Sequence, residues 1–138
     1  MPPHDPESWR ELGVQFRQQG RLDEAVDVLR RALDHAPGDA QALSELAHAL
    51  RWQGKLDEAR RAAARAIEIA PRLASAWFNL GAVQVEQGEV ARGIEAYHRA
   101  LELKPDFAEA WSNLGGALAA NGDGPGEIDA YRRAIGIN

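Results

Sequence analysis

The sequence predicts an all-α protein in which four antiparallel helix-turn-helix hairpins form an α-solenoid. The first observation is a period of 34 residues, which is typical of repeat architectures. Four series of identical residues keep this step in one shared phase: Leu12, Leu46, Leu80 and Leu114; Gly20, Gly54, Gly88 and Gly122; Ala32, Ala66, Ala100 and Ala134; Pro37, Pro71 and Pro105. The second observation is the place of glycine and proline, which end helices at regular intervals.

This phase divides the chain into four repeats and a short start. The repeats cover residues 6–39, 40–73, 74–107 and 108–138, and residues 1–5 form a disordered N-terminal start. Each hairpin buries its apolar face against its neighbours, so we expect one domain overall. No capping helix is evident after the fourth repeat. We therefore expect that the chain is a fragment of a longer array, that the uncovered face pairs with another copy, or that the last helix is polar enough to act as its own cap.

The first helix of each repeat carries a large residue, then a leucine, then a small residue. The large residues are Trp9, Leu43, Trp77 and Trp111, and the small ones are Gly13, Ala47, Gly81 and Gly115. This spacing places bulk on one helix face and lets a neighbouring helix approach beside the small residue. We expect the glycine that ends this helix to be left-handed, because that conformation is cheap without a Cβ.

The second helix of each repeat begins near a Leu-Asp-Glu segment in the first two repeats, at Leu22 and Leu56. Acidic residues in a first turn interact favourably with the helix dipole. Its expected core face carries Ala25, Leu29 and Ala32 in repeat one, and Ala59, Ala63 and Ala66 in repeat two. A proline follows and ends the helix.

The composition excludes several classes of function. The chain has 138 residues, 45% of them hydrophobic, a formal charge of −5 and no cysteine. A net acidic chain is a poor general binder of nucleic acid or of a membrane surface. There is no signal-like start and no apolar stretch of membrane-spanning length, so we expect a cytoplasmic protein. Arginine supplies 14 of the 16 basic residues, which is typical of a GC-rich bacterial genome.

The W-x2-L-G-x2-Y, A-x3-F, A and P pattern of these repeats resembles the tetratricopeptide repeat over nearly the whole chain. Residues 78–107 and 112–115 look most like the repeats of O-GlcNAc transferases. The resemblance implies a right-handed solenoid whose first helices line a concave groove that holds a peptide or a partner protein. Three residues depart from the pattern: Gln84 replaces an aromatic residue, and Gly93 and Glu127 replace alanine.

The groove positions of the first two repeats carry a basic group. Arg10, Arg17 and Arg51 are expected there together with His48. Guanidinium groups suit carboxylates, so this surface is a candidate for an acidic side chain or a chain terminus. The alternative is an ordinary solvated face on which Glu7, Glu11 and Glu45 neutralise the arginines.

Trp52 lies outside the repeat pattern, at the end of a first helix. One interpretation is an exposed aromatic anchor, a residue type that is enriched at binding hot spots. The other is packing on Leu56 across the turn, which we favour slightly.

The groove positions of repeats three and four are smaller and more apolar. Phe78 is expected to offer contact area to an extended peptide. Asn79 and Asn113 occupy the same position in successive repeats, and the resemblance to O-GlcNAc transferases implies that they bond a peptide backbone. The alternative is that both are structural asparagines that bond their own neighbours.

No residue pattern indicates an enzyme. The four histidines share no helix face and no repeat position, so we expect no metal site, catalytic residue or cofactor. The carboxylate clamp that binds chaperone tails is also not matched, since only Arg10 fits its positions. We therefore expect a protein–protein interaction scaffold. The alternatives are the recognition arm of an O-GlcNAc transferase-like enzyme and a self-assembly module that forms a homo-oligomer through its C-terminal end.

Overall fold

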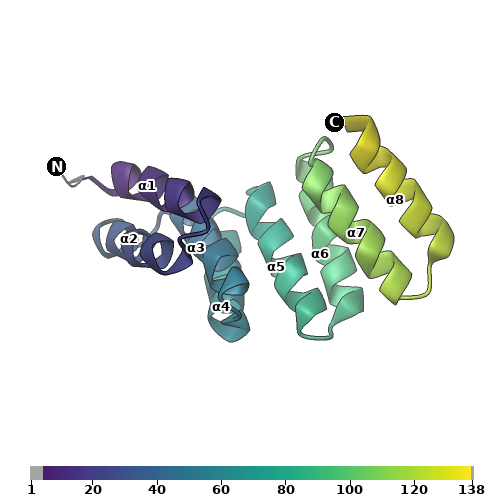
Figure 1. Cartoon of the computed structure of the whole chain (residues 1–138), viewed down its shortest axis with the longest axis horizontal. Coiled ribbons are helices and arrows are strands. Elements are labelled where there is room, and N and C mark those ends of the chain that lie inside the picture. The colour runs from purple at the N-terminus through teal and green to yellow at the C-terminus, as the bar shows by residue number, and fades with distance from the viewer. Residues whose placement is uncertain (1–4, 138) are drawn as a thin grey trace. The chain divides into compact units, whose positions relative to one another are not determined.

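The computed structural model describes residues 5–137, which form eight α-helices and no β-strand (Figure 1). The helices are α1 (Pro6–Gln18), α2 (Leu22–His35), α3 (Ala40–Trp52), α4 (Leu56–Ile69), α5 (Ala74–Glu86), α6 (Val90–Leu103), α7 (Ala108–Ala120) and α8 (Gly124–Ile137). Each odd-numbered helix packs against the next even-numbered helix, so that the chain forms four antiparallel hairpins. The predicted all-α fold of four helix-turn-helix hairpins is confirmed.

The contacts divide the chain into two compact units, where the repeat pattern predicts one domain. The first unit, Met1–Pro71, holds α1 to α4, and the second unit, Arg72–Asn138, holds α5 to α8. The expected disordered start at residues 1–5 lies outside the described residues except for Asp5. The Asp5 carboxylate accepts a hydrogen bond of 2.8 Å from the backbone N–H of Ser8 and so caps the start of α1.

The turn inside each hairpin depends on a glycine, as the sequence predicts. Among the described residues, positive φ angles occur only at the four glycines of the repeat series, with values of 77°, 80°, 89° and 84°. A side chain would strain this left-handed backbone. The chain can therefore end the first helix and begin the second within a few residues, which keeps the two helices of a hairpin in contact.

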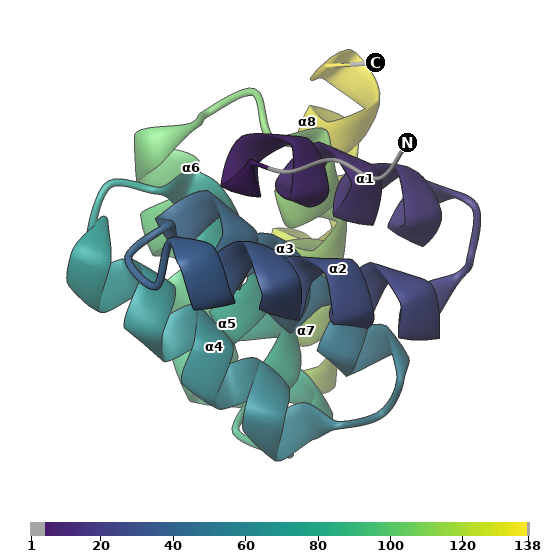
Figure 2. The same ribbon diagram turned by 90° about the vertical axis from the view of Figure 1, so that its left-hand side faces the viewer.

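In the first unit, the core lies between helices that run side by side (Figure 2). The predicted core residues of α2 and α4 have no exposed surface: Ala25, Leu29, Ala32, Ala59, Ala63 and Ala66. Gly13 shows why a small residue is needed on α1. A Cβ there would lie 2.6 Å from Cγ of Leu29, so the two helices pack closely at this point.

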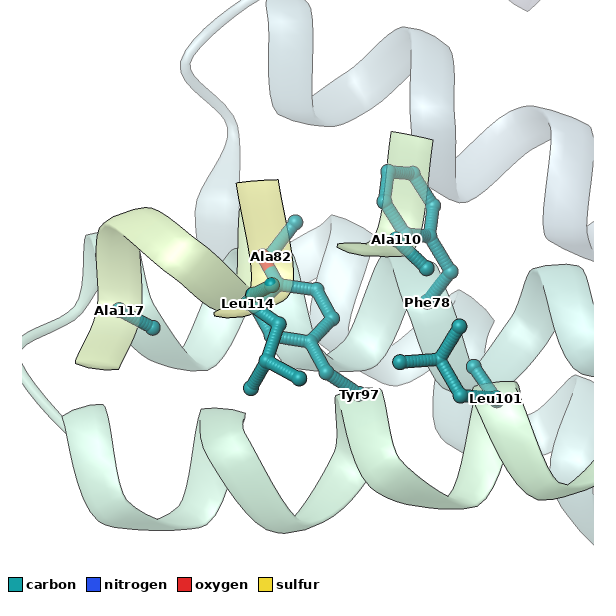
Figure 3. Packing of buried hydrophobic residues seen from close by; sticks show 9 residues of the cluster. Phe78, Ala82, Tyr97, Leu101, Ala110, Leu114 and Ala117 are labelled. Atoms are coloured by element: carbon teal, nitrogen blue, oxygen red, sulfur yellow. The ribbon is translucent and has the colours of Figure 1, made fainter. Parts of the chain in front are cut away.

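In the second unit, the core is built on aromatic rings (Figure 3). The ring of Phe78 lies 5.9 Å from that of Tyr97 and 5.0 Å from that of Phe107. The departure of Gly93 from alanine also has a packing reason. A Cβ at Gly93 would lie 2.9 Å from the backbone oxygen of Gly81 and would collide with the side chain of Val85, so α5 and α6 approach backbone to backbone.

The outer face of α8 is apolar and exposed. Ile128 is 54% exposed, Tyr131 is 37% exposed and Ile135 is 75% exposed. Only Ala130 and Ala134 of this helix are buried. Within the described part of the chain, no helix is long and apolar enough to cross a membrane.

Candidate functional site

A hollow of about 380 Å³ lies on the surface of the first unit, beside the C-terminal ends of α1 and α3. It is lined by Arg17, Gln18, Gly20, Leu22, His48 and Trp52. The structure thus brings together three of the five candidate residues of this unit. The remaining two, Arg10 and Arg51, do not line it.

Trp52 is an exposed part of this hollow, with 61% of its surface open to solvent. The favoured interpretation, packing on Leu56, is therefore wrong. Instead, the indole Nε1–H donates a hydrogen bond of 2.9 Å to Nε2 of His48, one helical turn earlier. The Arg51 guanidinium lies 5.1 Å from the centre of the indole ring. Both contacts come from the last turns of α3, so local helix geometry is sufficient to orient the ring.

Arg17 connects α1 to α3 through one edge of its guanidinium group. Its Nε donates a hydrogen bond of 2.9 Å to Oε2 of Glu45. Within residues 5–137 no acceptor bonds its two terminal nitrogens, Nη1 and Nη2. The alternative in which Glu45 neutralises the arginine is thus partly correct: the charge is paired, but four of the five N–H donors of the guanidinium have no acceptor within residues 5–137.

Arg10 has a structural role that the sequence did not suggest. Its Nη1 donates a hydrogen bond of 2.9 Å to Oδ2 of Asp39, and its Nη2 lies 3.9 Å from Oε1 of Glu7. The other oxygen of Asp39 accepts from the backbone N–H of Ala42 and caps α3. In the sequence, Asp39 precedes a predicted helix start, a position that indicates a helix cap. It does not indicate that Asp39 also binds Arg10.

Another arginine lies at the turn beside this hollow and is paired locally. A hydrogen bond to Glu24 raises the pKa of Arg21, whose guanidinium also lies 4.4 Å from the ring centre of Phe16. The positive charge of Arg21 is therefore paired with Glu24 of the same hairpin. Arg17 is the one arginine among the residues that line the hollow.

In the second unit, the candidate residues are less accessible than expected. Phe78 is 2% exposed and belongs to the core, so the expectation that it offers contact area to a peptide is wrong. The physical reason is its contact with Tyr97 and Phe107, which the sequence pattern did not reveal. Asn79 is 3% exposed, whereas Asn113 on the neighbouring helix α7 is half-buried.

A further hollow of about 540 Å³ lies on the second unit and was not anticipated. Its lining comes from α5 and α6: Trp77, Leu80, Gln84, Arg92, Glu95, Ala96, His98, Arg99 and Glu102. Gln84, the residue that replaces the aromatic of the pattern, is 8% exposed. Its buried Oε1 has no hydrogen-bond partner within residues 5–137. This substitution was the one sequence signal for the hollow.

Comparison with known proteins identifies the family. Two family models described as tetratricopeptide repeat match residues 16–83 and 83–138. No curated protein matches the chain. Within residues 5–137, no three histidine, cysteine or acidic side chains are grouped so that they could hold a metal ion.

Three solved structures illustrate the likeness. A crystal structure of MamA has 26% identity and a TM-score of 0.80, with 98% of this chain and 79% of that chain covered. An O-GlcNAc transferase mutant of Thermobaculum terrenum has 32% identity and a TM-score of 0.80, but the match covers 86% of this chain and only 23% of that one. A thermophilic TPR protein of Thermus thermophilus has 22% identity and a TM-score of 0.89, with 96% and 74% covered.

The family models, the 34-residue period and the four hairpins agree. The right-handed α-solenoid class follows from the match to the solved TPR protein. Such repeats generally act as non-catalytic scaffolds on which proteins assemble. The chain therefore belongs to the tetratricopeptide repeat family, and it is a helical protein-interaction scaffold.

Proposed function

We propose that the chain binds a partner protein through an extended peptide segment that lies along its first helices, in the cytoplasm of a bacterium. The observation that carries this proposal is that the exposed Trp52 lines the same hollow as Arg17, whose guanidinium is bonded only through Nε. Tryptophan and arginine are enriched at binding hot spots, and here the two side chains line the same hollow. His48 and Arg51 support the ring and so belong to the same proposed surface.

Arg10 contributes to this surface by holding its scaffold rather than by binding the partner. Its bond to Asp39 connects α1 to the start of α3. In the second unit we propose a smaller role for Asn113 and Asn79, whose amides suit a peptide backbone. Asn113 has the accessible surface for such a contact, and Asn79 has little.

The test is affinity capture with the immobilised chain, followed by measurement of one purified partner. Bacterial lysate is passed over the wild-type chain and over Trp52→Ala in parallel, and the retained proteins are identified. A partner bound on this surface is retained by the wild type and lost from the variant. A set of retained proteins that is the same on both chains contradicts the proposed surface.

Self-assembly is a second candidate because of the exposed face of α8. Ile128, Tyr131 and Ile135 follow a spacing of three and four residues and so share one face of the helix. A second copy would cover this face if α8 packed against its counterpart. Sedimentation across a concentration series tests this, with Ile135→Glu as the variant that keeps the chain monomeric. A wild-type chain that stays monomeric at all concentrations excludes it.

The recognition arm of a glycosyltransferase is a third candidate, and the 32% identity to an O-GlcNAc transferase mutant supports it. The match covers 23% of that protein, so any transferase activity would belong to a part that this chain does not contain. A reading frame that continues into a glycosyltransferase domain in the source organism would establish this candidate. A stop codon directly after the last residue would exclude it.

A further inference from the structure

We infer that the hollow beside α1 and α3 takes an internal peptide segment in which an apolar side chain is next to an aspartate or glutamate. This inference rests on the proposed function and specifies its ligand. The apolar side chain would contact Trp52 and Leu22, and the carboxylate would bond Arg17. The apolar contact and the carboxylate contact rest on separate observations.

The apolar half rests on Trp52 and Leu22. The indole ring is 61% exposed, yet its only polar atom is already bonded to His48. The ring therefore offers the hollow an apolar face with no donor left to satisfy. Leu22, the first residue of α2, is half-buried and adds aliphatic surface to the lining. Covering such surface with an apolar side chain is favourable, because water is released from both.

The polar half rests on Arg17. Glu45 fixes the guanidinium plane through Nε, and the terminal nitrogens have no acceptor within residues 5–137. The side chain of Arg17 is 22% exposed, so a ligand pays little ordering entropy to use it. A carboxylate can accept two parallel N–H bonds from such a fork. A lysine or arginine on the ligand would instead be repelled by the positive charge of Arg17.

The segment is internal rather than a chain terminus because the hollow is open at the turn. Gly20 lies in the lining, and a Cβ built there would meet nothing within 4 Å. Apart from the two chain neighbours, no atom lies within 4 Å of this point, which leaves room for a peptide to continue past the turn between α1 and α2. The lining also holds a single guanidinium, whereas a buried terminal carboxylate is usually held by several donors.

The experiment uses the full chain and an immobilised library of random peptides. Each peptide is flanked by Gly-Ser on both sides and carries no free α-carboxylate. Labelled wild-type chain, Trp52→Ala and Arg17→Gln are applied to identical copies. We expect the peptides retained by the wild type to be enriched in adjacent apolar and acidic residues, and we expect both variants to lose them.

One retained peptide is then measured in solution by fluorescence anisotropy. Trp52→Ala should weaken it about 30-fold and Arg17→Gln about tenfold, as for an aromatic hot spot and a charge-assisted bond. Replacing the peptide's acidic residue by its amide should weaken binding to the wild type. The same replacement should not weaken binding to Arg17→Gln any further, because the bond is already lost there. Arg30→Gln is the matched control, because Arg30 pairs with Glu58 at 3.0 Å on the second helices of the same two hairpins. It should bind like the wild type.

The outcomes separate this inference from the proposed function. If the wild type retains no peptide, the proposed peptide-binding function fails together with the inference. If it retains peptides without the apolar–acidic enrichment, or if both variants bind as well as Arg30→Gln, the inference alone is wrong. If the same segment binds only when it ends in a free carboxylate, the ligand is a chain terminus and the internal assignment is overturned. Circular dichroism of each variant verifies that it is folded.

Discussion

Trp52 and His48 are joined side chain to side chain, with the indole Nε1–H donating to the imidazole Nε2 at 2.9 Å. This bond fixes the tautomer of His48, since Nε2 accepts only when it carries no proton. It also holds the indole of an exposed residue in one orientation. The most accessible aromatic ring in the first unit is thus bonded to a histidine one helical turn earlier.

The Trp52–His48 bond gives a spectroscopic prediction. The chain has four tryptophans, so an amide correlation spectrum contains four indole N–H signals. Trp52→Phe removes one of them and so assigns it. In His48→Leu this signal should move upfield, because the donor loses its acceptor. A signal that stays in place in this variant contradicts the bond.

Gly81 gives a prediction about packing. A Cβ at Gly81 would lie 2.9 Å from Cδ1 of Tyr97 and 3.0 Å from the backbone oxygen of Gly93. Gly81→Ala should therefore lower the free energy of unfolding by about 1–3 kcal/mol, as overpacking does. Gly116 is the control, since its Cβ would meet only the hydroxyl of Tyr131 at 3.8 Å. Gly116→Ala should raise stability by about 0.5–1 kcal/mol through helix propensity. Urea unfolding measures both, and equal effects would contradict the packing argument.

Gln84 gives a prediction about a buried polar atom. Its Oε1 is buried on α5 with no partner within the described part of the chain. Gln84→Leu removes this desolvated acceptor and should raise the free energy of unfolding by about 1–3 kcal/mol. Gln41, which is exposed on α3, is the control, and Gln41→Leu should change stability by less than about 0.5 kcal/mol. Thermal unfolding of the two variants measures both effects. If Gln84→Leu is less stable than the wild type, the amide of Gln84 has a hydrogen-bond partner in solution and the prediction is wrong.

The last hairpin gives a prediction about local stability. α8 buries only Ala130 and Ala134, whereas α6 buries Gly93, Ala96, Tyr97, Ala100 and Leu101. Local opening costs less free energy where fewer apolar side chains are buried. Hydrogen exchange should therefore be faster for the amides of α8 than for those of α6. Equal protection of both helices would mean that another contact covers the face of α8.

The sequence by itself determined the helices and their ends. Glycine and proline act on the backbone of their own residues, so the left-handed turns and the starts of α2 and α4 were predictable from local chemistry. The core alanines of these two helices followed from the period in the same way. The repeat boundaries and the contacts with a partner stay predictions.

Only the tertiary structure decided which candidate side chains are accessible. Phe78 and Trp52 are both aromatic residues on first helices, yet one is 2% and the other 61% exposed. Phe78 is covered by Phe107 and Tyr97, which lie 29 and 19 positions away in the sequence. The exposure of a side chain depends on such distant neighbours and not on its own helix. For this reason the repeat pattern predicted the scaffold. The hollow lined by Trp52 and Arg17 could not be predicted in this way, because it exists only where α1 and α3 pack against each other.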